Sequence, residues 1–335
     1  MGDNIQKLKK LLTLLSKRDN FIITTHVKSD ADGIGAELAL SHLLTNIQKT
    51  NLILNPDEVR EKYKFIDTKS NIHYFDTSSM IRIPENPTVV IVDNSDIGRI
   101  GQIKSFINED KTNLIAIDHH NELEDSPWLY AFPEVGSTSE IIYELISMSN
   151  LRLDYDTAVA IYMGIIMDTG QFRYNKTRPR THEIAAKLLE FGFPTEDLSR
   201  RVFENTPIET LYLKRDIYST LVVYPESHFV TVSITREMLS QYNFTANPSE
   251  HVVNDMLGPA DIYMVASFTE MENGMVKISL RSKGNYNVCS IAKEFSGGGH
   301  TNASGATTQG TIEDVRADVV AKLIELYNNT YANGL

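Results

Sequence analysis

Cysteine is almost absent from this sequence. The 335 residues include a single cysteine, Cys289, so no internal disulfide can form. Disulfides are typical of oxidising compartments, and their exclusion favours the cytoplasm. Long apolar runs are missing too, since no stretch approaches the roughly 20 residues of a membrane helix. The segment 1–15 has the pattern of an amphipathic helix and not that of a signal peptide. We therefore expect a cytoplasmic protein without a membrane segment.

Dense clusters of basic residues are also missing. Lys and Arg number 32 against 44 Asp and Glu, which gives a formal net charge of −12 at pH 7. Only the segment 176–180, "KTRPR", concentrates positive charge locally. A protein that tracks long DNA or RNA needs a basic surface to neutralise phosphates. The composition therefore argues against long duplex nucleic acid as a partner and favours a small anionic substrate, held by a few placed groups and metal.

Strand-like and helix-like segments alternate in the first half of the chain. Short apolar runs bounded by polar or turn residues have the length of buried strands. They span residues 20–25, 51–54, 88–92 and 113–117. Helical patterns lie between them, and Gly33 and Gly35 are expected to let the backbone turn tightly into the first of these helices. Strands that alternate with helices predict an α/β domain with a parallel sheet and helices on both faces.

Three later segments of this half are predicted to be helices. Ser137 opens the sequence "STSE", a capping-box pattern that starts a helix. The apolar segment 156–170 is long enough to favour a buried helix over a strand. A further helix is expected over 181–193, with Thr181 as its N-cap and Gly192 at its end.

The character of the sequence changes near residue 220. A charged helical segment gives way to β-rich runs, with "ENG" (272–274) as a hairpin turn. A chain of this length is expected to form two domains. We expect a larger α/β domain over residues 1–194, a helical linker over 195–219 and a smaller α+β domain over 220–335.

Ionisable side chains follow four of the apolar segments at their carboxyl ends. In chain order they are His26, Asp30, Asp32, Asp93, Asp118, His119, His120 and Asp168. An aspartate in any one of these places is commonly a turn residue or a helix cap. Ligands bind at the carboxyl ends of strands in parallel sheets, however, and four independent caps would all have to fall on one edge. The cluster therefore indicates a functional site.

The residue types in this cluster favour a metal centre. Carboxylates with imidazoles and no thiolate suit Mn²⁺, Mg²⁺ or Fe²⁺. Two ions about 3.5–4 Å apart need a carboxylate that bridges them and separate ligands for each. One ion would be bound by His26 and Asp30, and the other by Asp32, His119 and Asp168. Asp93 would bridge the two ions. Such a pair of ions clamps a phosphoryl group, which predicts phosphoester hydrolysis.

The second domain contains a separate glycine-rich signal. Three consecutive glycines precede His300 in "FSGGGHTNASGA" (295–306). Backbone N–H groups of a glycine-rich turn can approach a phosphate closely. A flexible loop explains the same glycines equally well. Arg281, near the end of a predicted strand, is a candidate phosphate clamp, although such an arginine is usually solvated.

Five motifs, taken in order, resemble the DHH phosphoesterase superfamily, named after the triplet that here is Asp118-His119-His120. They are "HVKSDADGIGA" (26–36), "VDNSD" (92–96), "IDHH" (117–120), "GIIMDTGQFRY" (164–174) and, in the DHH-associated second domain, "GGGHTNASGA" (297–306). The resemblance covers nearly the whole chain and is strongest to the compact bacterial oligoribonucleases. Ser29 and Ala31 depart from the proline and glycine common in the first motif, which leaves the ligands unaffected.

The resemblance implies a role for each motif residue. The dinuclear site would bind two Mn²⁺ ions, with Mg²⁺ or another divalent ion as an alternative, through His26, Asp30, Asp32, Asp93, His119 and Asp168. Asp93 would bridge the ions, His120 would face the substrate phosphate, and Asp118 would support the triplet. From across a cleft between the domains, the terminal phosphate or nucleotide would be bound by Arg281, Gly298, Gly299 and His300.

The same resemblance implies hydrolysis of RNAs of two to five nucleotides to mononucleotides. Many such enzymes also remove the 3′-phosphate of 3′-phosphoadenosine 5′-phosphate (pAp) to give AMP. One alternative is a phosphodiesterase of cyclic di-AMP turnover, acting on the cyclic dinucleotide or on linear pApA. Another is a nucleotide sensor without catalytic activity. The oligomeric state stays open, with a homodimer among the alternatives.

Overall fold

The structure is a computed structural model that describes residues 2–75, 82–120, 126–242 and 249–332. The chain divides into two compact units, Met1–Asn205 and Thr206–Leu335. Each unit is described by itself below. Among the described residues, no helix combines the length and the apolar character that a membrane span requires.

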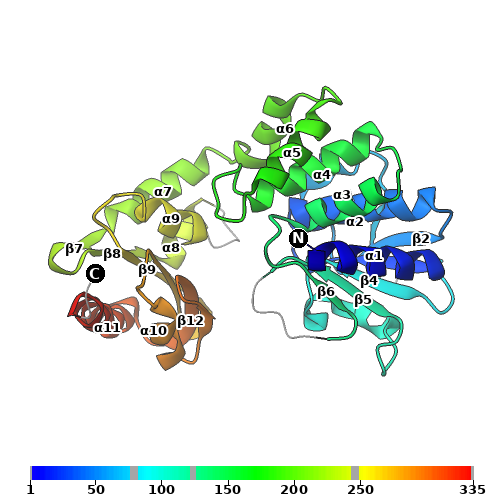
Figure 1. The fold of residues 1–335 in the computed structure, drawn as a ribbon. Coiled ribbons are helices and arrows are strands. Elements are labelled where there is room, and N and C mark those ends of the chain that lie inside the picture. The colour runs from blue at the N-terminus through cyan, green and yellow to red at the C-terminus, as the bar shows by residue number, and fades with distance from the viewer. Residues whose placement is uncertain (1, 76–81, 121–125, 243–248, 333–335) are drawn as a thin grey trace. The chain divides into compact units, whose positions relative to one another are not determined.

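The first unit is built on a parallel sheet (Figure 1). Its strands are β1 (Phe21–Thr24), β2 (Asn51–Asn55), β3 (Ile72–Tyr74), β4 (Thr88–Val92), β5 (Leu114–Asp118) and β6 (Leu129–Ala131). They are ordered β3-β2-β1-β4-β5-β6, and every neighbouring pair is parallel. The chain builds outward from β1 in one direction and from β4 in the other. The two central strands therefore flank the point at which the direction of winding reverses, where parallel sheets bind ligands.

Alternate residues of the central strands point to opposite faces of the sheet and belong to two different hydrophobic cores. Ile23, Val90 and Ile115 pack with the helices α1 (Gly2–Lys17), α2 (Ala31–Asn46), α3 (Thr138–Met148) and α4 (Tyr155–Asp168). Ile22 and Val89 face the other way and pack against the 3₁₀ segment η2 (Ile97–Phe106). A second 3₁₀ turn, η1 (Glu61–Ile66), joins the helical core. The α/β prediction is confirmed, with both faces of the sheet covered.

The helix starts agree with the predictions in part. The Ser137 hydroxyl accepts from the Glu140 N–H at 3.2 Å and caps α3 as expected, whereas the Glu140 carboxylate accepts from the Thr181 hydroxyl. Helix α5 spans Pro179–Leu189, and α6 spans Thr195–Phe203. The prediction that Thr181 is the N-cap of α5 is wrong, because proline occupies the first helical position, which favours it. Gly192, with φ +71°, follows the end of α5.

The second unit contains a mixed sheet (Figure 1). Its strands are β7 (Val222–Tyr224), β8 (Phe229–Ile234), β9 (Met264–Glu270), β10 (Met275–Ser282), β11 (Gly298–His300) and β12 (Ala303–Gln309). They are ordered β11-β12-β10-β9-β8-β7, with β8 and β9 parallel and the other pairs antiparallel. The 3₁₀ turn η3 (Pro225–Ser227) precedes β8, and η4 (Glu272–Gly274) forms the predicted hairpin turn.

Helices cover both faces of this second sheet. Met264 and Phe268 face α10 (Val288–Glu294) and α11 (Ile312–Ala332). Val232 faces α7 (Glu209–Ser219) and α9 (Ser249–Met256), and the short α8 (Arg236–Gln241) adds to the same core. The prediction of a second, α+β domain is confirmed.

Candidate metal centre

The strands β1, β4 and β5 bring their carboxyl ends together because they are neighbours in the sheet. His26 follows β1, Asp93 follows β4 directly, and Asp118 ends β5. Asp93 has φ +58°, which is uncommon for a residue other than glycine, and its N–H donates to Ile117 O at 3.0 Å. Backbone conformations of this kind are concentrated at functional sites, where the surrounding structure holds them in place.

Four side chains form a compact group at this edge. The ligand atoms of Asp32, Asp93, His119 and Asp168 all lie within 4.8 Å of one another. The distances from His119 Nε2 are 2.7 Å to Asp168 Oδ2, 3.4 Å to Asp93 Oδ1 and 4.0 Å to Asp32 Oδ2. Three carboxylates thus face one imidazole nitrogen, and a bound cation would relieve their mutual repulsion.

The chemistry of these donor atoms fits a divalent metal ion. His119 Nδ1 lies 3.3 Å from Val135 O, so it is placed to donate its proton there. Nε2 of the same ring is buried and makes no hydrogen bond of acceptable geometry within the described residues. An imidazole whose second nitrogen is held by a carbonyl is a typical metal ligand. Carboxylate oxygens and one imidazole are the donors that Mn²⁺ and Mg²⁺ accept.

Asp32 is held in place by the start of a helix. Its carboxylate accepts from Thr138 N at 2.6 Å and Ser139 N at 2.9 Å, the first two residues of α3. The positive end of the helix dipole favours a negative group there. Gly164 of α4 leaves the necessary room, because a Cβ at this position would lie 2.6 Å from Asp32 Oδ1. Gly164, which belongs to the fourth motif, therefore makes room for Asp32 of the first motif.

His26 and Asp30 lie outside the compact group of four. His26 Nε2 is 3.8 Å from Asp93 Oδ2, while its Nδ1 lies 2.8 Å from Val27 O and 2.9 Å from Arg99 Nη2. The contacts of Nδ1 leave Nε2 directed at Asp93. The Asp30 carboxylate caps α2 and accepts from Asp32 N at 2.9 Å. Asp93 is thus the residue that contacts both histidines, as a bridging ligand would.

The pKa values in the cluster are strongly displaced. Burial would raise the pKa of Asp93, but its contacts with His119 and His26 outweigh burial and hold the pKa well below the usual range. Burial opposes the charged form of His119, yet Asp168 and Asp93 raise its pKa to about 11. Burial and then Asp93 and Asp168 raise the pKa of Asp32 well above normal and that of Asp30 to about 6. Protons and divalent ions therefore compete for the same carboxylates.

Asp118 and His120 form a hydrogen-bonded pair, and a ring nitrogen of His120 lies within 4.8 Å of ligand atoms of Asp93 and His119. The Asp118 carboxylate Oδ1 lies 2.7 Å from His120 Nδ1 and accepts from His120 N at 3.1 Å. Asp118 is buried, whereas the His120 side chain is 52% exposed. The hydrogen bond to Asp118 raises the pKa of His120 against the effect of burial. This arrangement leaves the second ring nitrogen of His120 for a group outside the protein.

The candidate residues of the second unit are aligned by strand register. Arg281 of β10 and His300 of β11 both pair with Ala303 of β12. Directly paired residues of antiparallel strands point to the same face, so the two side chains share a row across three strands. Gly298, Gly299 and His300 form an exposed edge strand, where a loop or turn was expected. At Gly299, with φ +133°, a Cβ would meet Ala303 O at 2.5 Å.

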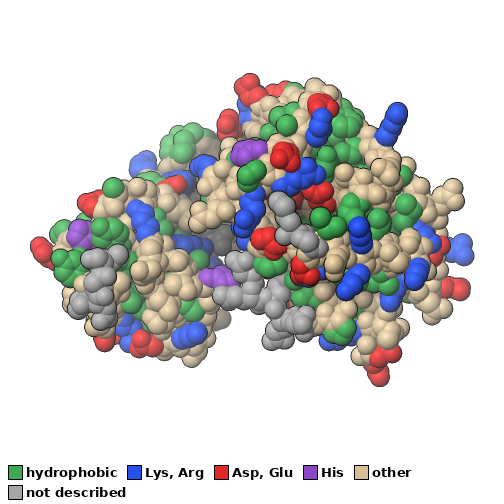
Figure 2. All heavy atoms as spheres, in the orientation of Figure 1, with side chains coloured by type: hydrophobic (Ala, Val, Ile, Leu, Met, Phe, Trp, Pro, Cys, Tyr) green, Lys and Arg blue, Asp and Glu red, His purple; other side chains and the backbone are tan. Residues whose placement is uncertain are grey.

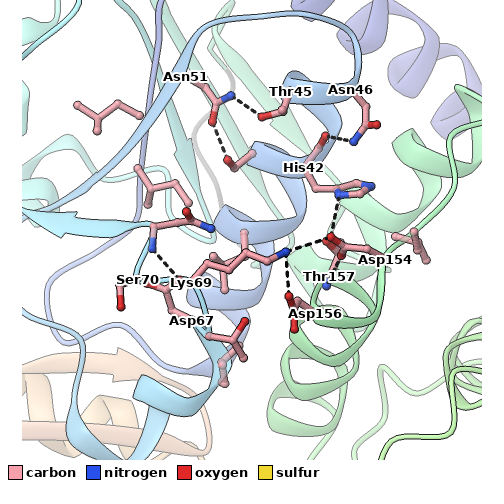
Figure 3. Close-up of a pocket in the computed structure, with 18 of the residues that line it drawn as sticks. His42, Thr45, Asn46, Asn51, Asp67, Lys69, Ser70, Asp154, Asp156 and Thr157 are labelled. Atoms are coloured by element: carbon pink, nitrogen blue, oxygen red, sulfur yellow. Dashed lines mark hydrogen bonds and ion pairs between the residues drawn. The ribbon is translucent and has the colours of Figure 1, made fainter.

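A pocket of about 800 Å³ lies elsewhere in the first unit (Figure 3). It is lined by the C-terminal half of α2, the start of β2 and the first turn of α4, away from the carboxyl ends of the strands. Lys69 points across it to Asp154 and Asp156, at 3.3 Å and 2.8 Å (Figure 3). None of the predicted metal ligands lines this pocket. The size of a cavity is therefore not what identifies the site in this protein.

Two contacts of the site have no clear signal in the sequence. Arg99 reaches His26 from η2, and the Lys176 ammonium donates to His119 O at 2.6 Å. The sequence marks the segment 176–180 by its local positive charge, and it favours contact with a substrate phosphate no more than a solvated approach to a helix. Both contacts depend on how distant segments pack, and periodicity does not reveal such packing.

Comparison with known proteins gives two family matches. Residues 20–165 match the DHH family, N-terminal domain, and residues 228–330 match the DHHA1 domain. The chain therefore carries a DHH-family N-terminal domain followed by a DHHA1 domain. The resemblance drawn from the five motifs is confirmed.

Relatives of similar length match this chain over nearly their whole sequences. The probable bifunctional oligoribonuclease and PAP phosphatase NrnA of Streptococcus mutans is 28% identical, over 91% of this chain and 95% of its own. The bifunctional oligoribonuclease and PAP phosphatase NrnA of Bacillus subtilis is 27% identical, over 89% and 92%. An exopolyphosphatase-related protein from Bacteroides fragilis has a solved structure with a TM-score of 0.84 and 28% identity, over 97% of both chains.

Proposed function

We propose that this protein is a metal-dependent phosphodiesterase that hydrolyses RNAs of two to five nucleotides to mononucleotides and removes the 3′-phosphate of pAp. The group of Asp32, Asp93, His119 and Asp168, of which the first three are buried, carries this proposal. The names of the relatives in Streptococcus mutans and Bacillus subtilis support the substrate class. The single cysteine favours the cytoplasm as its location.

We propose two Mn²⁺ ions as cofactors, with Mg²⁺ as an alternative. The six ligands would be His26, Asp30, Asp32, Asp93, His119 and Asp168. Bound divalent ions would stabilise negative charge on the reacting phosphoryl group. Val135 O and the N-terminus of α3 orient His119 and Asp32 for that task. His120, held by Asp118, would donate a proton or a hydrogen bond to the substrate phosphate.

The second domain is proposed to bind the end of the substrate. Arg281 and His300 share one face of the sheet, and the exposed backbone of Gly298 and Gly299 adjoins His300. A guanidinium, an imidazole and backbone N–H groups together suit a terminal phosphate. In this proposal residues 1–194 are the catalytic domain, 195–219 the linker and 220–335 the substrate-binding domain.

Short substrates also suit the surface. On the face drawn in Figure 2, basic and acidic side chains are interspersed, and they form no continuous basic stripe. A net charge of −12 does not attract a long polyanion. We therefore propose short RNA, dinucleotides and pAp as ligands and no long duplex.

A substrate-length series tests the proposal. Purified protein is incubated with Mn²⁺ and RNAs from two to twenty-four nucleotides, and with pAp, pApA and cyclic di-AMP in parallel. We expect the fastest release of mononucleotides from the shortest RNAs and release of AMP from pAp. Preference for the longest RNA would contradict the proposal. Faster hydrolysis of cyclic di-AMP than of short RNA would favour a role in cyclic dinucleotide turnover.

A further inference from the structure

Lys176 lies beside the candidate metal centre although it belongs to none of the five motifs. Its ammonium donates to the carbonyl oxygen of His119 at 2.6 Å, and its side chain is half-buried. Burial lowers the pKa of Lys176, while the carboxylates of Asp168, Asp118 and Asp93 act in the opposite direction. The ammonium therefore lies within the electric field of the carboxylate cluster.

The backbone after Asp168 delivers Lys176 to this place. Gly170, Gln171 and Phe172 have φ values of +56°, +60° and +65°, a left-handed run that ends α4 and reverses the chain. Thr169 is fully buried, and its carbonyl accepts from the N–H groups of Arg173 and Tyr174, both at 2.9 Å. Left-handed conformations cost roughly 1–2 kcal/mol for each residue other than glycine. Contacts around the segment offset this cost and hold it against the site.

The charge of the loaded centre indicates what Lys176 would bind. On the proposed function, the aspartates at positions 30, 32, 93 and 168 carry four negative charges, and two divalent ions cancel them. The ammonium of Lys176 is then no longer compensated by these four aspartates, and the carboxylates that still act on it are those of Asp118, which is paired with His120, and Glu134. It has three N–H donors, of which His119 O takes one. A phosphate group is the complementary ligand, because it supplies negative charge and several acceptor oxygens.

We propose that Lys176 is a substrate-binding residue that contacts the scissile phosphate on the His119 and Asp168 side of the metal centre. This inference rests on the proposed function and adds to it a cation that the family motifs do not include. A purely structural alternative is that the lysine only holds the His119 backbone. Under that alternative its loss would weaken metal binding, and under the proposal its loss weakens phosphate binding.

Three variants separate these roles. Lys176→Met keeps the length of the side chain and removes the charge, and Lys176→Arg keeps the charge. Lys187→Met is the matched control, because Lys187 is an exposed lysine of α5 that pairs with Glu190 at 2.7 Å. Calorimetry measures the affinity of each protein for Mn²⁺, and that of the Mn²⁺-loaded protein for AMP and inorganic phosphate. Steady-state kinetics with a dinucleotide and with pAp give KM and kcat.

We expect Lys176→Met to bind AMP about tenfold to a hundredfold more weakly, the range for a lost hydrogen bond to a charged group. KM should rise for both substrates, Mn²⁺ affinity should stay unchanged, and Lys176→Arg should retain most of the AMP affinity. Lys187→Met should match the wild type. Wild-type AMP affinity in Lys176→Met, a parallel loss of Mn²⁺ affinity, or no AMP binding by the wild type would each overturn the inference. If the wild type binds AMP but hydrolyses no nucleotide, the proposed function fails while the phosphate-binding role of Lys176 is still decided by the same titrations.

Discussion

Asp93 contacts both histidines of the candidate metal centre from a single position. Its two carboxylate oxygens lie 3.8 Å from His26 Nε2 and 3.4 Å from His119 Nε2, and the Thr138 hydroxyl donates to Oδ1 at 3.2 Å. A left-handed backbone directly after β4 directs the carboxylate to this point. No other described aspartate of the cluster approaches both rings within 4 Å. At the scale of single residues, the proposed bridge therefore depends on Asp93.

Replacing Asp93 with asparagine should reduce hydrolysis by at least about a hundredfold. An amide has one oxygen and no charge, so it cannot bridge two ions as a carboxylate does. Asparagine tolerates the left-handed conformation, so the fold should be retained. Initial rates on a dinucleotide, with far-ultraviolet circular dichroism as the check on folding, measure the effect. Unchanged turnover in Asp93→Asn would show that Asp93 is not the bridge.

Glu37 is a buried carboxylate outside the proposed chemistry. Its Oε2 accepts from Asn55 Nδ2 at 3.0 Å, whereas Glu37 Oε1 and Asn55 Oδ1 have no partner among the described residues. Burial raises the pKa of Glu37 well above 4.5, and the Asn55 hydrogen bond offsets this only in part. The folded protein therefore keeps a proton at pH values where the unfolded chain releases it. Stability should fall as the pH rises from 4.5 towards the raised pKa, and Glu37 contributes to that fall.

Glu37→Gln should remove this contribution. The new amide can accept from Asn55 Nδ2 and donate to Asn55 Oδ1, so Asn55 Oδ1 gains a donor and the unpartnered Glu37 oxygen is replaced by nitrogen. We expect stabilisation by about 1 kcal/mol or more at pH 8 and a smaller effect at pH 5. Urea unfolding at the two pH values measures it. Equal effects at both pH values would mean that Glu37 ionises in the folded protein as it does in the unfolded chain.

Two helices position three of the candidate ligands, and the close contact of these helices is the main feature at the scale of elements. Asp30 and Asp32 lie at the start of α2, and Asp168 ends α4. A Cβ at Gly35 would lie 2.3 Å from Ala160 O, so the two backbones approach more closely than a side chain allows. The expectation that Gly33 and Gly35 form a tight turn is wrong, since both lie inside α2. Gly35 serves the contact between the helices.

Gly35→Ala tests this contact, because the sign of the change in the free energy of unfolding depends on whether the two backbones are in close contact. In a helix interior with free space, alanine should stabilise relative to glycine by about 1 kcal/mol. Here the methyl group meets a backbone carbonyl, so we expect destabilisation by roughly 1–3 kcal/mol together with weaker Mn²⁺ binding. Gly298→Ala is the stability control, because a Cβ there meets nothing within 4 Å. Stabilisation by Gly35→Ala would refute the close approach.

Some elements could be predicted from the sequence and others could not. The strand 88–92 is found as expected, because it is apolar on both sides and polar residues mark both ends. The start of α5 is missed because Thr181 has the chemistry of an N-cap, while Pro179 begins the helix two residues earlier. The glycines before His300 form an edge strand because they pair with β12. That pairing forms a hairpin with only Thr301 and Asn302 between the two strands, and glycine content alone does not reveal it.

At the scale of the whole molecule, each unit has its own hydrophobic core. The candidate metal ligands lie between residues 26 and 168, all within the unit Met1–Asn205, whereas Arg281 and His300 belong to the unit Thr206–Leu335. A ligand that binds only the folded state stabilises the part that contains its site. Metal should therefore stabilise the first unit and leave the second unchanged, a difference that thermal unfolding can detect.

The single tryptophan, Trp128, makes this difference measurable because it packs against the sheet of the first unit. Free Mn²⁺ at a hundred times its dissociation constant should stabilise this unit by about 2.7 kcal/mol for each site. The transition in the Trp128 emission maximum should then rise by roughly 5–10 °C for each occupied site, and a chelator should reverse the rise. Asp168→Asn, which removes one ligand of the compact group, should reduce the shift. A rise in the unfolding temperature of both units, seen by calorimetry, would show that metal binding is not confined to the first unit. The absence of any shift would exclude the metal centre.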